Sequence, residues 1–229
     1  KVKTLSLSPE AIQKEHDLKI VFTPLHGTTY ELVPASLRNW GFTNIHTVPE
    51  QSIPDGDFPT VASANPEEPA AFKMALDLAR KIDADLAMAC DPDGDRIGIA
   101  VKNDAGEWTL LNGNQTNIIF TEYIIRRKKE LNQLKGGEYT VKTIVTTELI
   151  KDIAEKNHII CYDVYTGFKW IAREIRLREG KKKYIGGGEE SYGFLAEDFV
   201  RDKDAVSACC LIAEVAAWAK DNGKSLYQL

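Results

Sequence analysis

The sequence predicts an α/β protein made of two tandem α/β domains, each a mixed, mainly parallel sheet packed with helices. Three observations predict this. Short apolar runs alternate with segments of helical periodicity along the 229 residues. Clusters of Gly, Pro, Asn and Asp separate these segments. The order of elements then repeats, which places a boundary between residues 1–105 and 106–229, although the two halves share no convincing sequence repeat.

In the first half, apolar runs predict strands over residues 19–23, 45–48, 86–90 and 97–101. Helices are predicted over residues 30–40, ending at Gly41, and over residues 69–81, with Pro69 at the first position. The segment 49–69 is rich in Pro, Asp and Ser, so it is expected to form a long loop. Residues 103–106 (Asn-Asp-Ala-Gly) predict a turn after the fourth strand.

In the second half, apolar and β-branched runs predict strands over residues 141–146, 159–164 and 183–186. Helical periodicity predicts helices over residues 114–129, 148–157, 168–178 and 204–221. Gly136-Gly137 marks a loop, and Gly186-Gly187-Gly188 is expected to end the last strand. Asp204 is a suitable N-cap for the last helix.

Composition is that of a globular protein and argues against nucleic acid or a membrane as partner. The net charge is −5 with both signs interspersed, which is unlike a nucleic-acid-binding protein. No apolar run approaches membrane-spanning length. The four cysteines have no metal-ligand spacing, and the first residues lack the apolar core of a signal peptide. We therefore expect a reduced, cytoplasmic protein.

Three carboxylates follow the predicted strand 86–90, in the segment Asp91-Pro92-Asp93-Gly94-Asp95-Arg96. Like charges at this spacing repel one another unless a cation compensates them. Hard oxygen ligands, with no soft ligand nearby, favour Mg²⁺ at Asp91, Asp93 and Asp95. Arg96 adds a guanidinium, which is well shaped for phosphate. The segment therefore predicts a phosphoryl-handling site at the carboxyl end of a strand.

The acidic segment has other interpretations. An EF-hand calcium loop also begins Asp-x-Asp-x-Asp, but it needs Gly at position six and Glu at position twelve, where this chain has Arg96 and Lys102. An Asp-nucleophile phosphatase of the haloacid dehalogenase type has Asp-x-Asp-Gly-Thr after a strand. Asp95 replaces the Thr here, and the segment lies in mid-chain. The phosphatase and a plain solvated acidic turn both stay open as alternatives.

A second polar segment, Gly186-Gly187-Gly188-Glu189-Glu190-Ser191-Tyr192-Gly193, has the residue types of a sugar site. Glycine allows the backbone to approach a ligand closely. Glu189 and Ser191 are two residues apart, so in extended backbone they point the same way. A carboxylate with a hydroxyl suits the vicinal hydroxyls of a sugar. The alternative interpretation is a polar, glycine-rich hairpin.

The segment Thr166-Gly167-Phe168-Lys169 lies between a predicted strand and a predicted helix. Backbone amides in the first turn of a helix can bind an anion, and Gly167 leaves room for one. Lys169 can add charge to a phosphate site or move a proton. The alternative is an ordinary helix start with an exposed lysine.

Taken together, these motifs resemble those of the α-D-phosphohexomutase family, the phosphoglucomutases and phosphomannomutases. Residues 91–96 resemble the family's metal loop, residues 188–191 its sugar loop, and residues 166–169 its Thr-Gly-x-Lys segment. Pro24 to Thr28 and Asn65-Pro66-Glu67 also resemble segments of the second domain. The resemblance implies that the chain holds domains two and three of a four-domain enzyme.

Two family segments are missing from this chain, which implies that the first and fourth domains lie outside it. One is the phosphoserine loop, Thr-Ala-Ser-His-Asn-Pro, and the other is an Arg-Pro-Ser-Gly-Thr-type phosphate loop. Ser63 lies in a segment that is only superficially similar to the phosphoserine loop. Because the nucleophile is expected elsewhere, the fragment alone is expected to be inactive.

The resemblance implies Mg²⁺-dependent transfer of phosphate between the 1- and 6-positions of a hexose phosphate. The route would be a phosphoserine and a hexose 1,6-bisphosphate, which would also activate the parent enzyme. Asp91, Asp93 and Asp95 would hold Mg²⁺, while Arg96 would steady the phosphate and Lys169 would contact phosphate or move a proton. The substrate would be bound by Thr166, Gly167, Gly188, Glu189 and Ser191. The form Glu-Glu-Ser-Tyr-Gly resembles glucose-type members. A non-catalytic module that binds Mg²⁺ and a sugar phosphate is the second hypothesis.

Overall fold

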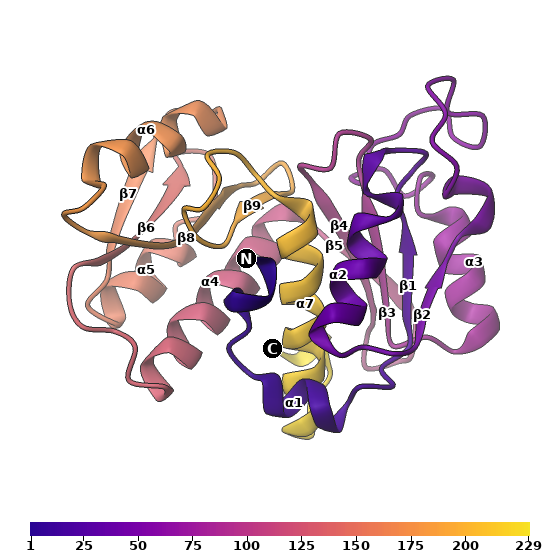
Figure 1. Ribbon diagram of the computed structural model, residues 1–229, viewed down its shortest axis with the longest axis horizontal. Coiled ribbons are helices and arrows are strands. Elements are labelled where there is room, and N and C mark those ends of the chain that lie inside the picture. Colours follow the sequence, from indigo (N-terminus) through magenta and orange to yellow (C-terminus); the bar gives the residue numbers. More distant parts are fainter.

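The computed structural model describes residues 1–229 and contains two β-sheets with helices packed around them (Figure 1). The first sheet has five strands in the order β2-β1-β3-β4-β5, and the second has four in the order β7-β6-β8-β9. In each sheet three neighbouring strands are parallel, and the remaining strands are antiparallel additions at one edge. The predicted fold class, with two mixed and mainly parallel sheets, is confirmed.

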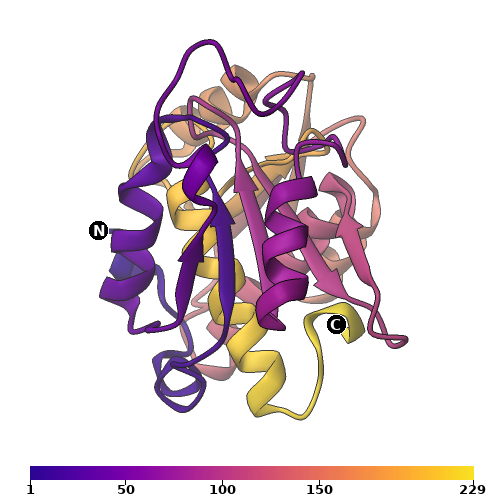
Figure 2. The same ribbon diagram turned by 90° about the vertical axis from the view of Figure 1, so that its right-hand side faces the viewer.

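The strands of the first sheet are β1 (Ile20–Thr23), β2 (Ile45–Thr47), β3 (Leu86–Cys90), β4 (Ile97–Lys102) and β5 (Trp108–Leu111). The helical elements of this half are η1 (Val2–Leu5), α1 (Pro9–Lys14), η2 (Thr28–Tyr30), α2 (Leu32–Trp40), η3 (Pro49–Gln51) and α3 (Lys73–Ile82). Figure 2 looks onto the face of the sheet that α3 covers, with α7 behind the strands. Every residue of β1 and β3 is buried, because helices cover both faces.

The predicted helix over residues 69–81 is correct except at its start. The helix begins at Lys73, and the preceding residues form successive turns. Phe72 is fully buried there, and its ring lies where a Cβ on Gly98 would sit. Burial of this ring under β4 therefore takes precedence over the helix-starting preference of Pro69. Strand β5 was not predicted, because three of its four residues are only half-buried and offer a weak pattern.

The second half contains α4 (Gly113–Glu130), β6 (Glu138–Thr143), α5 (Leu149–Lys156), β7 (Ile160–Val164), α6 (Phe168–Arg178), β8 (Lys183–Glu189), β9 (Gly193–Leu195), α7 (Ala205–Asp221) and η4 (Leu226–Gln228). Asp204 is the N-cap of α7 as predicted, and its carboxylate accepts from Val206 N at 3.1 Å and Ser207 N at 3.3 Å. No helix combines the length and the apolar character needed to cross a membrane.

Two predicted strands of the second half have wrong bounds. Strand β6 ends at Thr143 rather than at residue 146, because Ile144 and Val145 are more than half exposed after it and do not face a core. Strand β8 does not end at Gly186. It continues through Gly187 and Gly188, which pair with Val141 and Lys142 of β6. Strand β9, which has only three residues, was not predicted.

Helix α7 lies between the two sheets (Figure 1). It contacts α1, α2 and β3 of the first half as well as α4 and β9 of the second. Thirteen of its 17 residues are buried, as expected for a helix that is mostly apolar. The predicted division at residues 105 and 106 falls inside the β4–β5 hairpin, and β5 completes the first sheet. That division stays a prediction.

Glu214 of α7 is fully buried and ties three parts of the chain together. Its carboxylate accepts from Leu7 N at 2.8 Å and from the Tyr123 hydroxyl of α4 at 2.9 Å. The Ser6 hydroxyl also donates to it. Loss of hydration on burial raises the pKa of Glu214, although these hydrogen bonds oppose the shift by favouring the charged form. The folded protein therefore holds a proton at Glu214 more tightly than the unfolded chain does.

We expect stability to depend on pH through Glu214. Because its pKa is raised above the ordinary 4.5, the free energy of unfolding should fall as pH rises above 4.5. One such group contributes a slope of at most about 1.4 kcal/mol per pH unit. Urea unfolding of wild type and Glu214→Gln between pH 4.5 and 7 measures this. The advantage of wild type over the variant should shrink as pH rises, and an advantage that grows with pH would contradict the assignment.

Candidate functional site

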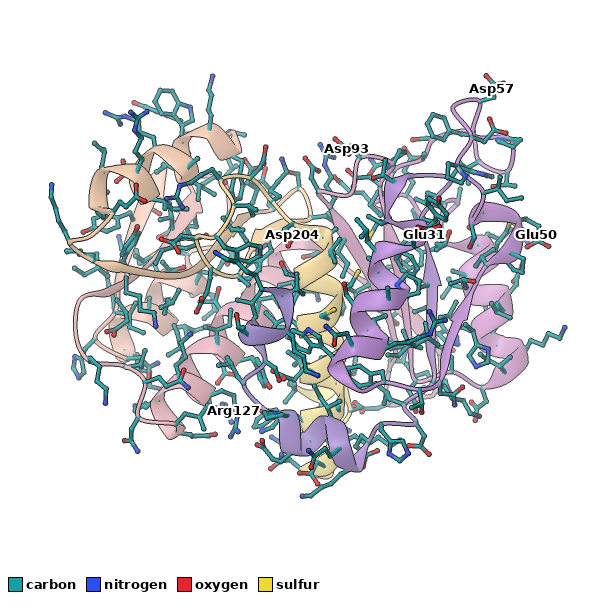
Figure 3. The ribbon with its side chains drawn as sticks, viewed as in Figure 1. Glu31, Glu50, Asp57, Asp93, Arg127 and Asp204 are labelled. Carbon is teal, nitrogen blue, oxygen red and sulfur yellow. The ribbon has the colours of Figure 1, made fainter.

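The two polar segments found in the sequence lie side by side at the carboxyl ends of parallel strands. The metal loop, residues 91–96, follows β3, and the sugar loop, residues 188–191, spans the end of β8. Arg96 and Gly193 form an antiparallel bridge, and Ile97 N donates to Tyr192 O at 3.1 Å. Figure 3 shows Asp93 where the two halves meet. A ligand of one loop is therefore within reach of the other.

The carboxylates of Asp91, Asp93 and Asp95 each have an oxygen within 4.8 Å of the others. Asp91 is buried at the end of β3, and its Oδ1 accepts from Asp95 N at 3.1 Å and from Arg96 N at 2.9 Å. These bonds hold the loop curled around the Asp91 side chain. Gly94, with φ +78°, makes the turn possible, and a Cβ there would lie 2.6 Å from the methyl group of Thr29.

The protonation of Asp91 indicates what the cluster can hold. The pKa of Asp91 is raised to about 7, chiefly by burial and also by the nearby charges of Asp95 and Asp93, while the hydrogen bond from the Arg96 amide opposes the shift. A bound divalent cation would reverse this shift, because it favours the ionised carboxylates. Three closely spaced oxygen ligands fit a hard cation such as Mg²⁺. The residues present therefore fit the metal that the sequence predicts.

Two cations border the cluster. The Arg96 side chain is held by Glu67, with Nη1 3.1 Å from Oε1, and its Nε lies 3.7 Å from Asp91 Oδ2. Lys203, just before α7, places Nζ 2.8 Å from Asp95 Oδ2. Sequence reasoning missed Lys203, because a charged run before a helix usually faces solvent. Only the contact of the two halves brings it to the metal loop.

The turn after β1 packs against the metal loop. Thr28 N donates to Pro92 O at 2.8 Å, and a Cβ on Gly27 would lie 2.3 Å from Pro92 Cα. His26 has a structural position, since its ring nitrogens contact Ile53 O at 3.0 Å and Thr60 Oγ1 at 2.8 Å. His26 therefore fixes the long loop after β2 rather than reaching the carboxylates.

The sugar loop and the Thr166–Gly167 turn are brought together. Glu189 is buried, and its Oε1 accepts from Gly167 N at 2.8 Å. Gly167 has φ +113° at the start of α6, so a side chain there would be strained. Ser191 is half-buried beside them. This bond uses only one of the two carboxylate oxygens of Glu189.

Two further observations describe this region. Lys169 is exposed, and its Nζ lies 5.5 Å from the centre of the Trp170 ring. The glycines of β8 lie close to neighbouring protein atoms. A Cβ on Gly187 would lie 2.2 Å from Val141 O, and one on Gly188 would lie 2.0 Å from Asn117 Oδ1.

Comparison with known proteins gives a consistent picture. A family model for phosphoglucomutase/phosphomannomutase, alpha/beta/alpha domain II, matches residues 1–106, and the corresponding model for domain III matches residues 112–229. The phosphoglucomutase of Staphylococcus aureus strain MRSA252 is 43% identical over 210 residues, which cover 92% of this chain and 37% of that protein. The chain therefore spans little more than a third of this relative.

Solved structures share the fold. A putative phosphomannomutase from Thermus thermophilus matches with a TM-score of 0.72 at 22% identity, over 99% of this chain and 48% of that one. A phosphoglucomutase/phosphomannomutase family protein from Burkholderia thailandensis matches with a TM-score of 0.68 at 18% identity, over 94% of this chain and 44% of that one. At these identities the likeness is one of architecture.

We expect Asp93→Asn to weaken Mg²⁺ binding at least tenfold, because it removes one of the three clustered charges. Calorimetric titration with MgCl₂ measures the affinity. Asp57→Asn is the control, since Asp57 is exposed at the tip of another loop (Figure 3). Equal affinities for wild type and Asp93→Asn would contradict the metal assignment.

Proposed function

The chain belongs to the phosphoglucomutase/phosphomannomutase family, and we propose that it is the part of such an enzyme that holds Mg²⁺ and the hexose phosphate. The observation that carries this proposal is the bridge between Arg96 and Gly193, which joins the metal loop to the first residue of β9, two residues after the sugar loop. A phosphate bound near the carboxylates would lie beside a hexose bound at Glu189. We further propose that the two domains divide at residues 105 and 106.

The proposed reaction of the whole enzyme is phosphoryl transfer between a serine and a hexose. The phosphoserine lies on a domain outside this chain. Its O–P bond breaks as a hydroxyl oxygen of the hexose phosphate forms a new bond to phosphorus and loses its proton to a base. The hexose 1,6-bisphosphate then turns around and returns its other phosphate to the serine. Mg²⁺, when bound, neutralises charge on the phosphoryl group being transferred.

The residues of this chain have distinct proposed roles. Asp91, Asp93 and Asp95 hold the metal. Arg96, kept in place by Glu67, steadies the phosphate, since a fixed guanidinium stabilises phosphoryl charge without reorganisation. This division of roles places the metal ligands and the fixed guanidinium on the metal loop.

The second half supplies the hexose contacts. Glu189 accepts hydrogen bonds from hexose hydroxyls through its Oε2, and Ser191 supplies a second polar contact. Gly188, Thr166 and Gly167 shape the floor of the hexose site. Lys169 lies in the first turn of α6, from which a long flexible side chain can contact phosphate or move a proton.

The remaining part of the proposal concerns which sugar is the substrate and what this chain does by itself. Glucose phosphates are the proposed substrates, supported by the sequence Glu-Glu-Ser-Tyr-Gly and by the names of the curated relatives. For this chain by itself, a binding module for Mg²⁺ and sugar phosphate is the favoured description. The reason is that the chain spans 37% of those relatives and contains no matching serine loop.

We expect this chain alone not to convert glucose 1-phosphate into glucose 6-phosphate. The test is a coupled assay with glucose-6-phosphate dehydrogenase, in the presence of Mg²⁺ and glucose 1,6-bisphosphate. Sustained turnover by the pure chain would show that the nucleophile lies within these residues.

Glucose 1-phosphate should nevertheless bind. We expect Glu189→Gln to weaken its binding at least tenfold, because charge-assisted hydrogen bonds to the hexose are lost. An NMR titration measures the affinity. Glu107→Gln, at an exposed glutamate in the β4–β5 turn, is the control. Binding of equal strength in wild type and Glu189→Gln would place the hexose elsewhere.

A further inference from the structure

We infer that Thr143 and Thr146, at and just after the end of β6, are positioning residues for the sugar loop, with Lys142 beneath them. None of the three belongs to a motif found in the sequence. The inference rests on the proposed function in one respect, namely that the ligand of the sugar loop is a hexose phosphate. The contacts that support it are independent of that ligand.

The side chain of Glu190 connects the sugar loop to these threonines. Glu190 Oε2 lies 3.0 Å from Thr143 Oγ1 and 3.1 Å from Thr146 Oγ1, and Glu190 N donates to Thr146 Oγ1 at 3.1 Å. The two hydroxyl oxygens are 2.7 Å apart. Both threonines are buried. The hydroxyls therefore hold both the backbone and the side chain of Glu190.

Thr146 makes one more of these contacts than Thr143 does. Each hydroxyl has one proton to donate and can accept two hydrogen bonds. The two hydroxyl protons are shared among three close contacts, which join Thr143 to Glu190, Thr146 to Glu190 and the two threonines to each other. Only Thr146 also accepts from the Glu190 amide. Thr146 is therefore the central member of the network, and its hydroxyl is the group to remove.

Lys142 fixes the backbone from which Thr146 projects. Its side chain is fully buried, and its Nζ lies 2.7 Å from Glu148 Oε1 and 2.8 Å from Asp163 Oδ1. It also donates to Thr146 O at 3.1 Å. An ammonium has three protons to donate, and these three acceptors use them. A buried ammonium without such partners would be strongly unfavourable, so the loop after β6 is held to this geometry.

The orientation of Glu190 bears on the ligand because of its place between Glu189 and Ser191. Glu190 is the first residue of the turn between β8 and β9, so anchoring its amide and its carboxylate fixes both the end of β8, which carries Glu189, and the turn, which carries Ser191. Asn117 secures the same loop from α4, since its Nδ2 donates to Glu189 O at 2.9 Å. Without the hydrogen bonds to Glu190, the loop would be more mobile, and Glu189 and Ser191 could rotate away from the hexose. Loss of the Thr146 hydroxyl should therefore weaken ligand binding without touching the ligand.

Thr140 provides a matched control on the same strand. It is buried in β6, and its Oγ1 donates to Gly186 O on β8 at 2.5 Å. Thr140→Val therefore removes a buried hydroxyl that also joins β6 to β8, but at a position that precedes the sugar loop. Thr146→Val and Thr140→Val separate positioning of the loop from general stability.

The experiment compares wild type, Thr146→Val, Thr146→Ser and Thr140→Val in this chain. NMR amide exchange is measured for residues 188–191, and glucose 1-phosphate with Mg²⁺ is titrated into each protein. We expect Thr146→Val to accelerate exchange at Glu190 at least tenfold and to raise the dissociation constant of glucose 1-phosphate at least tenfold. Thr146→Ser, which retains the hydroxyl, should restore both to within twofold of wild type. Thr140→Val should change neither beyond twofold.

The outcomes separate this inference from the proposed function. Unchanged exchange at Glu190 in Thr146→Val, failure of Thr146→Ser to restore it, or an equal effect of Thr140→Val would overturn the positioning role. If wild type does not bind glucose 1-phosphate, the proposed function of the chain fails. The exchange comparison still decides the positioning role in that case, because it needs no ligand.

Discussion

Concentrated negative charge at the end of β3 is the constraint on which the arrangement of the two halves depends. Three carboxylates leave a buried strand within one short loop, and the loop curls around Asp91 by donating backbone amides to it. In the second half, the ammonium of Lys203 forms an ion pair with Asp95 and so offsets part of this charge. It also donates Ala205 N to Gly94 O at 3.1 Å. The metal loop is thus shaped by its own backbone amides and held in place by contacts from the second half.

Much of the fold follows from local patterns, and the exceptions have physical reasons. The continuous apolar runs of β1 and β3 predicted buried parallel strands, and helices do cover both faces of these strands. The predicted end of β6 was too late because Ile144 and Val145 are exposed, although β-branched residues such as these favour strands. The glycines of β8 looked like a strand end, but they fit a sheet in which neighbouring atoms leave no room for a Cβ.

Some residues of the candidate site could likewise be predicted from the sequence, and others could not. Asp91, Asp93, Asp95 and Glu189 carry their chemistry in local spacing, so a sequence motif could reveal them. Lys203 and Thr146 act through contacts with residues distant in the sequence, and their own neighbours in the chain give no signal of this. Spacing along the chain can predict the groups that are proposed to touch a ligand. The groups that hold those groups in place become visible only when the chain is folded.

Helix α7 restricts how this part of the molecule can move. Its buried Glu214 bonds to the first residues of the chain and to α4, its side chains pack on both halves, and Lys203 precedes its first turn. A hinge motion between the sheets would have to break these bonds and uncover apolar surface at once, which makes it costly. We therefore expect the two halves to move together as one rigid body. If the proposed hexose phosphate binds here, its binding should therefore leave the separation of the two halves unchanged.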